Sequence, residues 1–349
     1  MRNIKFLKEY YKGYLNTYLK PAQLEVKGAY ADFGILNPSI GTSNLGDLII
    51  YESVYNNLRE IFPEAMFTNF PTQLFTSYDT MNLVRQKQLL FVSGTNLLSS
   101  NLESRFQWKI HDGQKSFLKN KVVLLGCGWW QYQEGITPYT RKIYKSILHN
   151  GNLLHSVRDQ YTLNKLKSIG IENIVNTSCP TFWNLSSEKC ASISRRRKGN
   201  VVTTLTFYHR DYKADKGMLE ILSKKYAKVH LWIQGLEDIN YYEELGANLP
   251  NLFFIPPTIE AYNRILDTGE VDYIGTRLHA GARALQKKVR TLILAVDNRA
   301  KEIGKDINLN VIDQKDYTKI ESFIDEEYIT DIQLPVNEIR MWKESLIVK

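Results

Sequence analysis

Short apolar runs alternate along this chain with longer stretches in which apolar positions recur every three or four residues. In the first half the runs are Ala65–Phe70, Leu89–Ser93, Val122–Gly126, Leu153–Val157 and Ile174–Thr177. The longer stretches between them include Asp47–Ile61, Pro138–His149 and Gln160–Ile169. Short apolar runs are typical of buried strands, and the longer spacing is typical of amphipathic helices. Their alternation from about residue 26 to residue 180 predicts a parallel sheet with helices on both faces.

A polar, serine-rich and basic tract, Ser186–Gly199, interrupts this pattern and predicts a linker. The alternation then resumes. The strands expected after it are Val201–Phe207, Val229–Gln234, Leu252–Ile255, Val271–Ile274 and Thr291–Val296. The helices expected between them are Ala214–Tyr226, Asp238–Leu245, Ile259–Leu266 and Arg277–Gln286.

The pattern therefore predicts an α/β protein of two Rossmann-like, doubly wound domains, with a ligand-binding cleft between them. We expect an N-terminal domain over residues 1–185, a linker over 186–199 and a C-terminal domain over 200–325. Residues 326–349 have a helical pattern around Trp342, and we expect that segment to pack on the first domain.

A net charge of +8 favours acidic partners, such as a phosphorylated substrate or an anionic membrane surface. We do not expect nucleic acid, because the positive charge is scattered and no nucleic-acid-binding motif accompanies it. The one dense basic run, Arg195–Lys198, is either a surface loop or a contact with anionic lipid.

The first ten residues lack the apolar core of a signal peptide, and no window has the ~20 apolar residues of a membrane span. We therefore expect a soluble, cytoplasmic protein. The three cysteines, Cys127, Cys179 and Cys190, lack metal-ligand spacing, so we expect reduced thiols, no metal and no cofactor.

The stretch Val271–Gln286 predicts a strand, a tight turn and a helix. Arg277 and His279 lie where the strand passes into the helix, beside the free N–H groups of its first turn. This is an anion-binding position with an acid–base group beside it. The helix has an apolar stripe, formed by Leu278, Ala282 and Leu285. Because the stripe fills the buried face, we assign His279 to function rather than to packing.

Five other segments carry candidate chemistry, and most of them have a second interpretation. Asn37–Ile50 is either a ligand loop or a capping turn in which Asp47 caps a helix; it lacks the spacing of a dinucleotide fingerprint. In Ser156–Asp159, Asp159 is a candidate N-cap, and Arg158 is either its structural neighbour or an arm that reaches the cleft.

In Tyr208–Asp211, His209 and Arg210 are either a second cation pair near the cleft or part of a solvated loop. Glycine also follows two predicted strands, at Gly94–Asn96 and at Gly126–Trp130. The second is followed by a dense aromatic group, made of Trp129, Trp130 and Tyr132. These rings either stack on a sugar or pack between loops and domains.

Taken together, four segments resemble the polysaccharide pyruvyl transferase family over roughly residues 35 to 310. They are Asn44–Asp47, Ser156–Asp159, Gly275–Gly281 and Asp297–Gly304, in this order. The specific part is Arg277-Leu278-His279 with the later Asn-Arg-x-x-Glu-Ile-Gly, which contains Asn298, Arg299 and Glu302.

The resemblance implies a two-domain fold similar to GT-B glycosyltransferases. It also implies transfer of a pyruvyl group from phosphoenolpyruvate to two hydroxyls of a sugar, which gives a cyclic ketal and inorganic phosphate. Arg277, Leu278 and His279 match the donor-binding or catalytic segment. Trp129 and Trp130 depart from the family's looser glycine-rich pattern, which leaves the acceptor open.

On this hypothesis phosphoenolpyruvate is a co-substrate held first by Arg277, with Arg210 or Arg158 second and His209 nearby. A basic cleft would steer this anion inward. His279 is the expected acid, because the unperturbed pKa of a histidine side chain is near 6.5. Asp47 or Glu302 is the expected base. Asn44, Trp129, Trp130 and Tyr132 are the expected acceptor-binding residues.

Two other functions stay open at the level of sequence: a nucleotide-sugar glycosyltransferase of the same architecture, and a non-catalytic sugar- or lipid-carrier-binding protein of glycan assembly. The acceptor is equally open. It is free, nucleotide-linked, glycan-linked or carried on a polyprenyl lipid at the inner membrane face.

Overall fold

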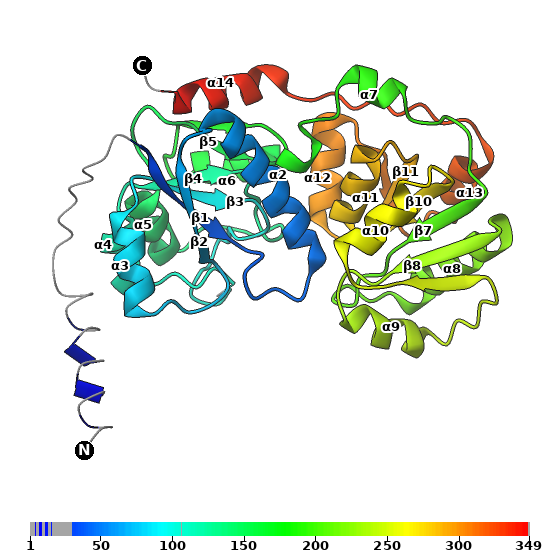
Figure 1. The fold of residues 1–349 in the computed structure, drawn as a ribbon, viewed down its shortest axis with the longest axis horizontal. Coiled ribbons are helices and arrows are strands. Elements are labelled where there is room, and N and C mark those ends of the chain that lie inside the picture. The colour runs from blue at the N-terminus through cyan, green and yellow to red at the C-terminus, as the bar shows by residue number, and fades with distance from the viewer. Residues whose placement is uncertain are drawn as a thin grey trace. The chain divides into compact units, whose positions relative to one another are not determined.

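The computed structural model describes residues 30–105 and 107–347, together with residues 4, 7, 8, 11, 12 and 15. Most of the segment before residue 30, which the sequence assigns to the first domain, lies outside the described residues. The chain forms two compact units (Figure 1). The first comprises Met1–Thr42, Tyr51–Thr177 and Val336–Lys349, and the second Ser43–Ile50 and Ser178–Pro335.

The first unit contains a parallel sheet in the order β2-β1-β3-β4. Its strands are β1 (Asp32–Asn37), β2 (Met66–Pro71), β3 (Leu90–Ser93) and β4 (Val122–Leu125). A parallel pair, β5 (His155–Val157) and β6 (Ile174–Asn176), lies beside β4, where the Gly126 N–H donates to the Ser156 carbonyl. The helices are α3 (Tyr78–Gln86), α4 (Lys115–Leu118), α5 (Pro138–Ile147), α6 (Gln160–Lys167) and α14 (Val336–Leu346), with a 3-10 turn at Asp112–Gln114.

The second unit contains a six-stranded parallel sheet in the order β12-β11-β10-β7-β8-β9. The strands are β7 (Asn200–Thr203), β8 (Lys228–Trp232), β9 (Leu252–Ile255), β10 (Val271–Gly275), β11 (Thr291–Ala295) and β12 (Val311–Asp313). The helices are α7 (Ser187–Ala191), α8 (Tyr212–Lys225), α9 (Glu237–Leu245), α10 (Ile259–Leu266), α11 (Leu278–Gln286), α12 (Asn298–Ile307) and α13 (Tyr317–Asp325), with a 3-10 turn at Pro180–Phe182. Numbered along the chain, the strand order is 3-2-1-4-5-6, that of the Rossmann fold.

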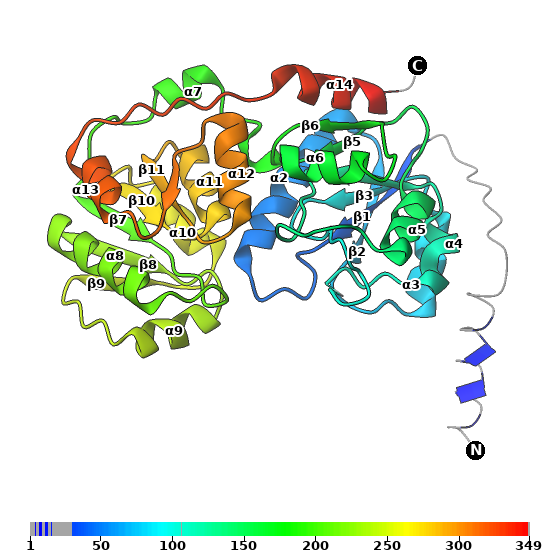
Figure 2. The same cartoon turned by 180° about the vertical axis from the view of Figure 1, so that it is seen from behind.

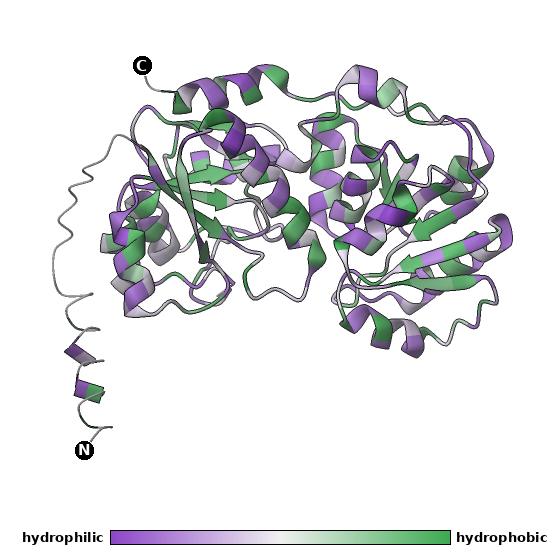
Figure 3. Ribbon diagram, in the orientation of Figure 1, coloured by the Kyte–Doolittle hydropathy of each residue, from purple (hydrophilic) through white to green (hydrophobic). Residues whose placement is uncertain are grey.

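Both faces of this second sheet are covered by helices (Figures 1 and 2). Along β10, Tyr273 packs in one apolar cluster with α10, α11 and α12, whereas Ile274 packs in another with α8, α9 and α13. Successive side chains of a strand point to opposite faces, so a sheet covered on both faces needs apolar residues in nearly every position. The strands are accordingly mostly hydrophobic, while the helices carry both kinds of residue (Figure 3). The predicted α/β class with parallel sheets is confirmed.

A helix of 17 residues, α2 (Leu45–Ile61), belongs to both units: its first turns lie in the second unit, and its residues from Tyr51 onward lie in the first. The predicted linker residues contain α7 and belong to the second unit. Helix α14 belongs to the first unit, where the Leu154 N–H donates to the Ser345 hydroxyl.

Two predicted strands end at least two residues earlier than expected, and both differences matter for the site. Strand β7 ends at Thr203 rather than at Phe207, because the carbonyl of Thr204 accepts the Thr276 N–H in a loop outside the ladder. Strand β8 ends at Trp232, so Gln234 lies in a loop instead of a strand. The sequence pattern also missed β1, α3, α12 and β12.

The basic run has acidic partners close by: Arg196 pairs with Glu327 at 2.7 Å and Arg197 with Asp325 at 3.3 Å. All three cysteines are buried free thiols. Among the described residues, no helix is both long and apolar enough to cross a membrane. The same residues hold no group of three or more His, Cys, Asp or Glu side chains suited to a metal ion.

Candidate functional site

A pocket lies at the carboxyl ends of the central strands of the second unit. Its walls come from the segments that follow β7, β8, β10 and β11, and Asn44, directly before α2, completes them. It is lined by Asn44, Tyr208, Gln234, Thr276, Arg277, Leu278, His279, Val296, Asp297, Arg299 and Ala300. Strands β7 and β10 are neighbours, although the chain leaves β7 toward β8 on the other side. This is the topological switch point, where open α/β sheets bind ligands.

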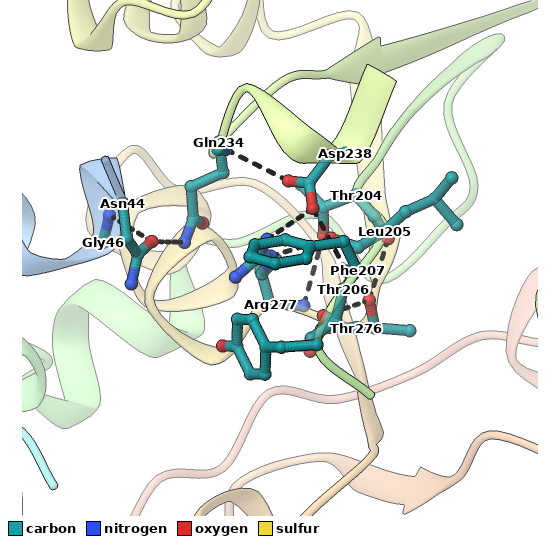
Figure 4. A network of polar contacts seen from close by, with 12 residues as sticks. Asn44, Gly46, Thr204, Leu205, Thr206, Phe207, Gln234, Asp238, Thr276 and Arg277 are labelled. Carbon is teal, nitrogen blue, oxygen red and sulfur yellow. Dashed lines mark hydrogen bonds and ion pairs between the residues drawn. The ribbon is translucent and has the colours of Figure 1, made fainter. Parts of the chain in front are cut away.

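Arg277 is held rigidly in this pocket. Its backbone N–H donates to the Thr204 hydroxyl at 3.2 Å, and its Nε donates to the Leu205 carbonyl at 2.7 Å (Figure 4). Its Nη2 lies 2.5 Å from Oδ1 of Asp238, a fully buried carboxylate on α9. Burial raises the pKa of Asp238, whereas Arg277 and the N–H groups of Gly235 and Phe207 oppose the rise.

The remaining nitrogen of this guanidinium is available to a ligand. Arg277 is only 2% exposed, and its Nη1 has no hydrogen-bond partner among the described residues. The Tyr208 ring lies 4.7 Å from the guanidinium carbon and restricts it further. A buried donor without a partner is costly, so an acceptor atom bound in the pocket would remove that cost.

The N-terminus of α11 opens beside Arg277 without a capping side chain. Arg277 occupies the N-cap position but makes no side-chain cap bond. The two other helices that start at the pocket are capped. Asp297 caps α12 by accepting the Arg299 N–H, and Asn44 caps α2 by accepting the Gly46 N–H. Uncapped N–H groups and the helix dipole together favour an anion at α11.

His279 lies in the first turn of α11 and lines the pocket. Its Nε2 is 4.0 Å from the Sγ of Cys179. The reasoning that an apolar stripe leaves His279 outside the core is wrong, because α11 is buried on all sides from Leu278 to Leu285. The helix packs against β10, β11 and the 3-10 turn at Pro180–Phe182. His279 reaches the pocket because it belongs to the first turn.

A second arginine of the pocket is also paired with an aspartate. Nε of Arg299 donates to Oδ2 of Asp297 at 2.7 Å, and its Nη2 donates to the Tyr208 hydroxyl at 3.1 Å. Burial raises the pKa of Asp297, but the Arg299 charge outweighs burial and lowers that pKa to about 2. Because both arginines have a carboxylate partner, the pocket is less positive than the basic cleft that the sequence suggests.

His209 lies beside this pair, with its Nε2 3.8 Å from Asp297. Burial, together with the nearby charges of Arg299 and Arg277, lowers the pKa of His209 despite Asp297. A neutral imidazole is therefore favoured there. Arg210, predicted as its partner in a cation pair, is instead bound to Glu244 at 2.5 Å and to the Phe207 carbonyl, and it does not line the pocket.

Arg158 lies in the first unit and is completely buried. It contacts Asn96 and lies 3.4 Å from Asp159, which caps α6 as predicted by accepting the Thr162 N–H. Gly128 makes room for it, since a Cβ there would lie 2.2 Å from Nε of Arg158. Packing against this arginine thus explains the glycine at position 128.

The three predicted acceptor aromatics also lie in the first unit, and they differ in exposure. Trp129 is fully buried and donates to Gln133 at 2.9 Å, so it is part of the core. The ring of Trp130 is half-buried under the Arg105 guanidinium, 4.1 Å away. Tyr132 is the exposed member, at 55%.

The predicted bases do not line the pocket. Asp47 lies in the first turn of α2 but does not cap it, because Asn44 does. Glu302 lies on α12 and pairs with Lys305 at 2.9 Å. Asn298 is the first residue of α12 and is buried beside the pocket lining, without being part of it.

Two residues of the site were missed in the sequence: Gln234 and Asp238. Both follow β8, and Gln234 was assigned to the strand itself. The signal that could identify Gln234 is a polar residue within two positions of the end of a buried strand, as Thr276 is after β10. Asp238 gives no such signal, since a carboxylate in the first turn of a helix is common.

These features define a Rossmann-type unit with an arginine-containing pocket at its switch point. The sequence matches the model of a family described as "Polysaccharide pyruvyl transferase" over residues 44–298. The chain therefore belongs to the polysaccharide pyruvyl transferase family, and it is a transferase of that class. No curated protein matches the sequence significantly.

Among solved structures, the chain is similar to UDP-GlcNAc 2-epimerase of Methanocaldococcus jannaschii in complex with UDP-GlcNAc and UDP. The TM-score is 0.47 at 11% identity, over 91% of this chain and 98% of that one. E. coli heptosyltransferase WaaC with ADP-2-deoxy-2-fluoro heptose gives 0.37 at 9% identity, over 76% and 88%. Because both TM-scores are below 0.5, the fold class rests on the strand order of this chain itself.

Proposed function

We propose that this protein transfers the pyruvyl group of phosphoenolpyruvate to two hydroxyls of a sugar, and that the pocket of the second unit binds the donor. The observation that carries the proposal is the buried Nη1 of Arg277, which has no hydrogen-bond partner among the residues that the structure describes and adjoins the uncapped N-terminus of α11. Phosphoenolpyruvate offers a carboxylate and a phosphate, the groups that guanidinium and helix N–H donors bind best.

The two Arg–Asp pairs of the pocket support this role. Asp238 binds Nη2 of Arg277 and holds the guanidinium in one orientation, which also fixes the direction of Nη1. Arg299 is fixed by Asp297 in the same way. Donors that are already oriented lose little freedom when the anion binds, which favours affinity and orientation. The pocket thus selects its anion by fixed geometry more than by net charge.

The chemistry balances with the groups present. His279 gives a proton to the methylene carbon, and a sugar hydroxyl attacks the adjacent carbon, forming the first C–O bond. The C–O bond to phosphate then breaks, and the second hydroxyl attacks the same carbon. One hydroxyl proton restores the acid form of His279 and the other leaves on phosphate. Protonation at the reacting carbon by a positioned imidazole is ordinary general-acid catalysis.

The acceptor and its carrier are not defined by this pocket. We propose that the reaction takes place in the cytoplasm, because the donor is a highly charged metabolite. Contact with an anionic membrane surface stays a prediction; the salt bridges of Arg196 and Arg197 leave fewer free charges for it than the sequence alone suggests.

The test is phosphate release from phosphoenolpyruvate with galactosides, mannosides and glucosamine derivatives as acceptors, including lipid-linked forms. We expect release that depends on one acceptor class and is lost in His279→Ala. Binding of a nucleotide sugar, with neither binding nor turnover of phosphoenolpyruvate, would instead indicate a glycosyltransferase. Sugar binding without phosphate release under any condition would indicate a non-catalytic binding protein.

A further inference from the structure

The pocket contains an unsatisfied acceptor as well as an unsatisfied donor. Gln234 lines it and is 2% exposed, and its Oε1 has no hydrogen-bond partner in the part of the chain that the structure describes. Arg277 Nη1 is a donor and needs an acceptor, whereas Gln234 Oε1 needs a donor. One fully ionised anion supplies acceptor oxygens only.

The direction of the Gln234 amide is fixed by a chain of hydrogen bonds. Asn44 caps α2, so its Oδ1 must face the Gly46 N–H, at 3.1 Å. The same Oδ1 accepts Nε2 of Gln234 at 2.7 Å (Figure 4). If the Gln234 amide were reversed, two carbonyl oxygens would face each other. Its Oε1 is therefore held away from Asn44 and cannot exchange places with Nε2.

Gly46 is needed for this arrangement. A Cβ at position 46 would lie 2.8 Å from Nε2 of Gln234 and 3.2 Å from Oδ1 of Asn44. The first turn of α2 thus approaches the Gln234 amide as closely as a glycine allows. Backbone contact reinforces it, since the Leu45 N–H donates to the Gln234 carbonyl at 3.0 Å.

We propose that Gln234 determines acceptor specificity by accepting a hydrogen bond from a sugar hydroxyl beside the bound donor. This inference rests on the proposed function and adds a residue to it. A hydroxyl is the group that satisfies Oε1, and each acceptor sugar must bring two to the donor. An amide oxygen cannot remove a proton at neutral pH, so Gln234 orients the hydroxyl and does not act as a base. An acceptor without that hydroxyl leaves Oε1 buried and unpaired, which is the basis of strong discrimination.

The experiment separates donor binding from use of the acceptor. Binding of phosphoenolpyruvate alone is measured by calorimetry, and phosphate release is measured against the concentration of the glycoside that the wild-type protein uses. Gln234→Met should lower kcat/KM for the acceptor by roughly 10- to 100-fold, the effect of one buried hydrogen bond, and leave the Kd for phosphoenolpyruvate within about twofold.

Two further variants keep this test independent of folding. Gly46→Ala keeps glutamine at position 234 but shifts its side-chain amide. It should lower the kcat/KM for the acceptor by roughly 3- to 10-fold. Gln314→Met is the matched control: Gln314 is another buried glutamine whose Oε1 lacks a partner among the described residues, and it does not line the pocket. Its kinetics should equal those of the wild-type protein.

Analogues of the same glycoside, each lacking one hydroxyl, complete the test as competitive inhibitors. The wild-type protein should bind one of these analogues more weakly than it binds the parent glycoside. Gln234→Met should bind that analogue and the parent glycoside equally well. Unchanged acceptor kinetics in Gln234→Met, or an equal loss of phosphoenolpyruvate binding, would overturn the role of Gln234 while the proposed function stands. A wild-type protein that neither binds phosphoenolpyruvate nor releases phosphate would overturn both.

Discussion

Two arginines in this molecule lie in similar places along the chain and have different surroundings. Arg158 lies between β5 and α6 in the first unit, and Arg277 lies between β10 and α11 in the second. In the first unit Asp159 caps the helix, and Gly128 packs on the Arg158 guanidinium. In the second unit no side chain caps α11, and Arg277 lines the pocket.

The difference lies in how the helix N-terminus is satisfied. A carboxylate at the N-cap neutralises the N–H groups that an anion would otherwise bind. An arginine at the N-cap cannot accept those N–H groups, so they remain for a ligand. An arginine between a strand and a helix therefore indicates an anion site only where no capping acid follows it.

Replacing each arginine by methionine is the strongest way to break the comparison. Arg277→Met should lower kcat/KM for phosphoenolpyruvate by about 1,000-fold or more, because it removes a charge-assisted contact to the donor. Arg158→Met should leave donor binding unchanged and reduce the free energy of unfolding by about 3 kcal/mol, since Asp159 loses a buried partner. Steady-state kinetics and urea unfolding measure the two effects; equal kinetic losses would remove the distinction.

His279→Ala should act on turnover more than on affinity. Loss of a general acid lowers kcat by roughly 100- to 10,000-fold, while Arg277 and the α11 N-terminus continue to hold the anion. The Kd for phosphoenolpyruvate should rise by less than about tenfold, a loss of 1.4 kcal/mol. A parallel loss of affinity and turnover would mean that His279 only binds the donor.

The two units should also respond to acid in opposite directions. Burial lowers the pKa of His155 in the first unit to about 4, so its stabilising contribution is complete above pH 6.5 and is lost as pH falls toward 4. Burial raises the pKa of Asp215 in the second unit to about 6, so its contribution is present below pH 3.8 and is lost as pH rises through 6. Each amounts to at most about 3 kcal/mol.

Hydrogen exchange at pH 7.5 and pH 4.5 measures this contrast for each unit separately. Acid should weaken protection of the first unit relative to the second. His155→Gln should reduce the change in the first unit, and Asp215→Asn should make the second unit more stable at pH 7.5 but not at pH 4.5. The same pH response in both units, unaffected by these substitutions, would contradict the assignment.

Gly128→Ala gives the smallest effect. The new Cβ would lie 2.2 Å from Nε of Arg158, and overpacking of this kind costs about 1–3 kcal/mol of stability. Thermal unfolding should show the loss, while the Kd for phosphoenolpyruvate stays the same. A change in donor affinity would mean that Gly128 serves the ligand after all.

The alternation of apolar runs and helical stretches was sufficient to predict the α/β class, because strands covered on both faces must be apolar throughout. Arg277 and His279 were recognisable because an arginine and a histidine, two residues apart, lie where such a strand passes into a helix. Gln234 was not, since its apolar neighbours extended the apparent strand by two residues. The pairing of Asp238 with Arg277 depends on tertiary structure, because it forms only where the segments after β7 and β8 come together. The lack of a side-chain cap on α11 also cannot be read from the sequence pattern.

The most direct test of the account is calorimetric titration of phosphoenolpyruvate into the wild-type protein, Arg277→Met and Arg158→Met. The account predicts saturable one-site binding to the wild-type protein and to Arg158→Met, and no measurable binding to Arg277→Met. Equal binding to all three, or loss in Arg158→Met alone, would contradict the claim that the pocket of the second unit holds the donor.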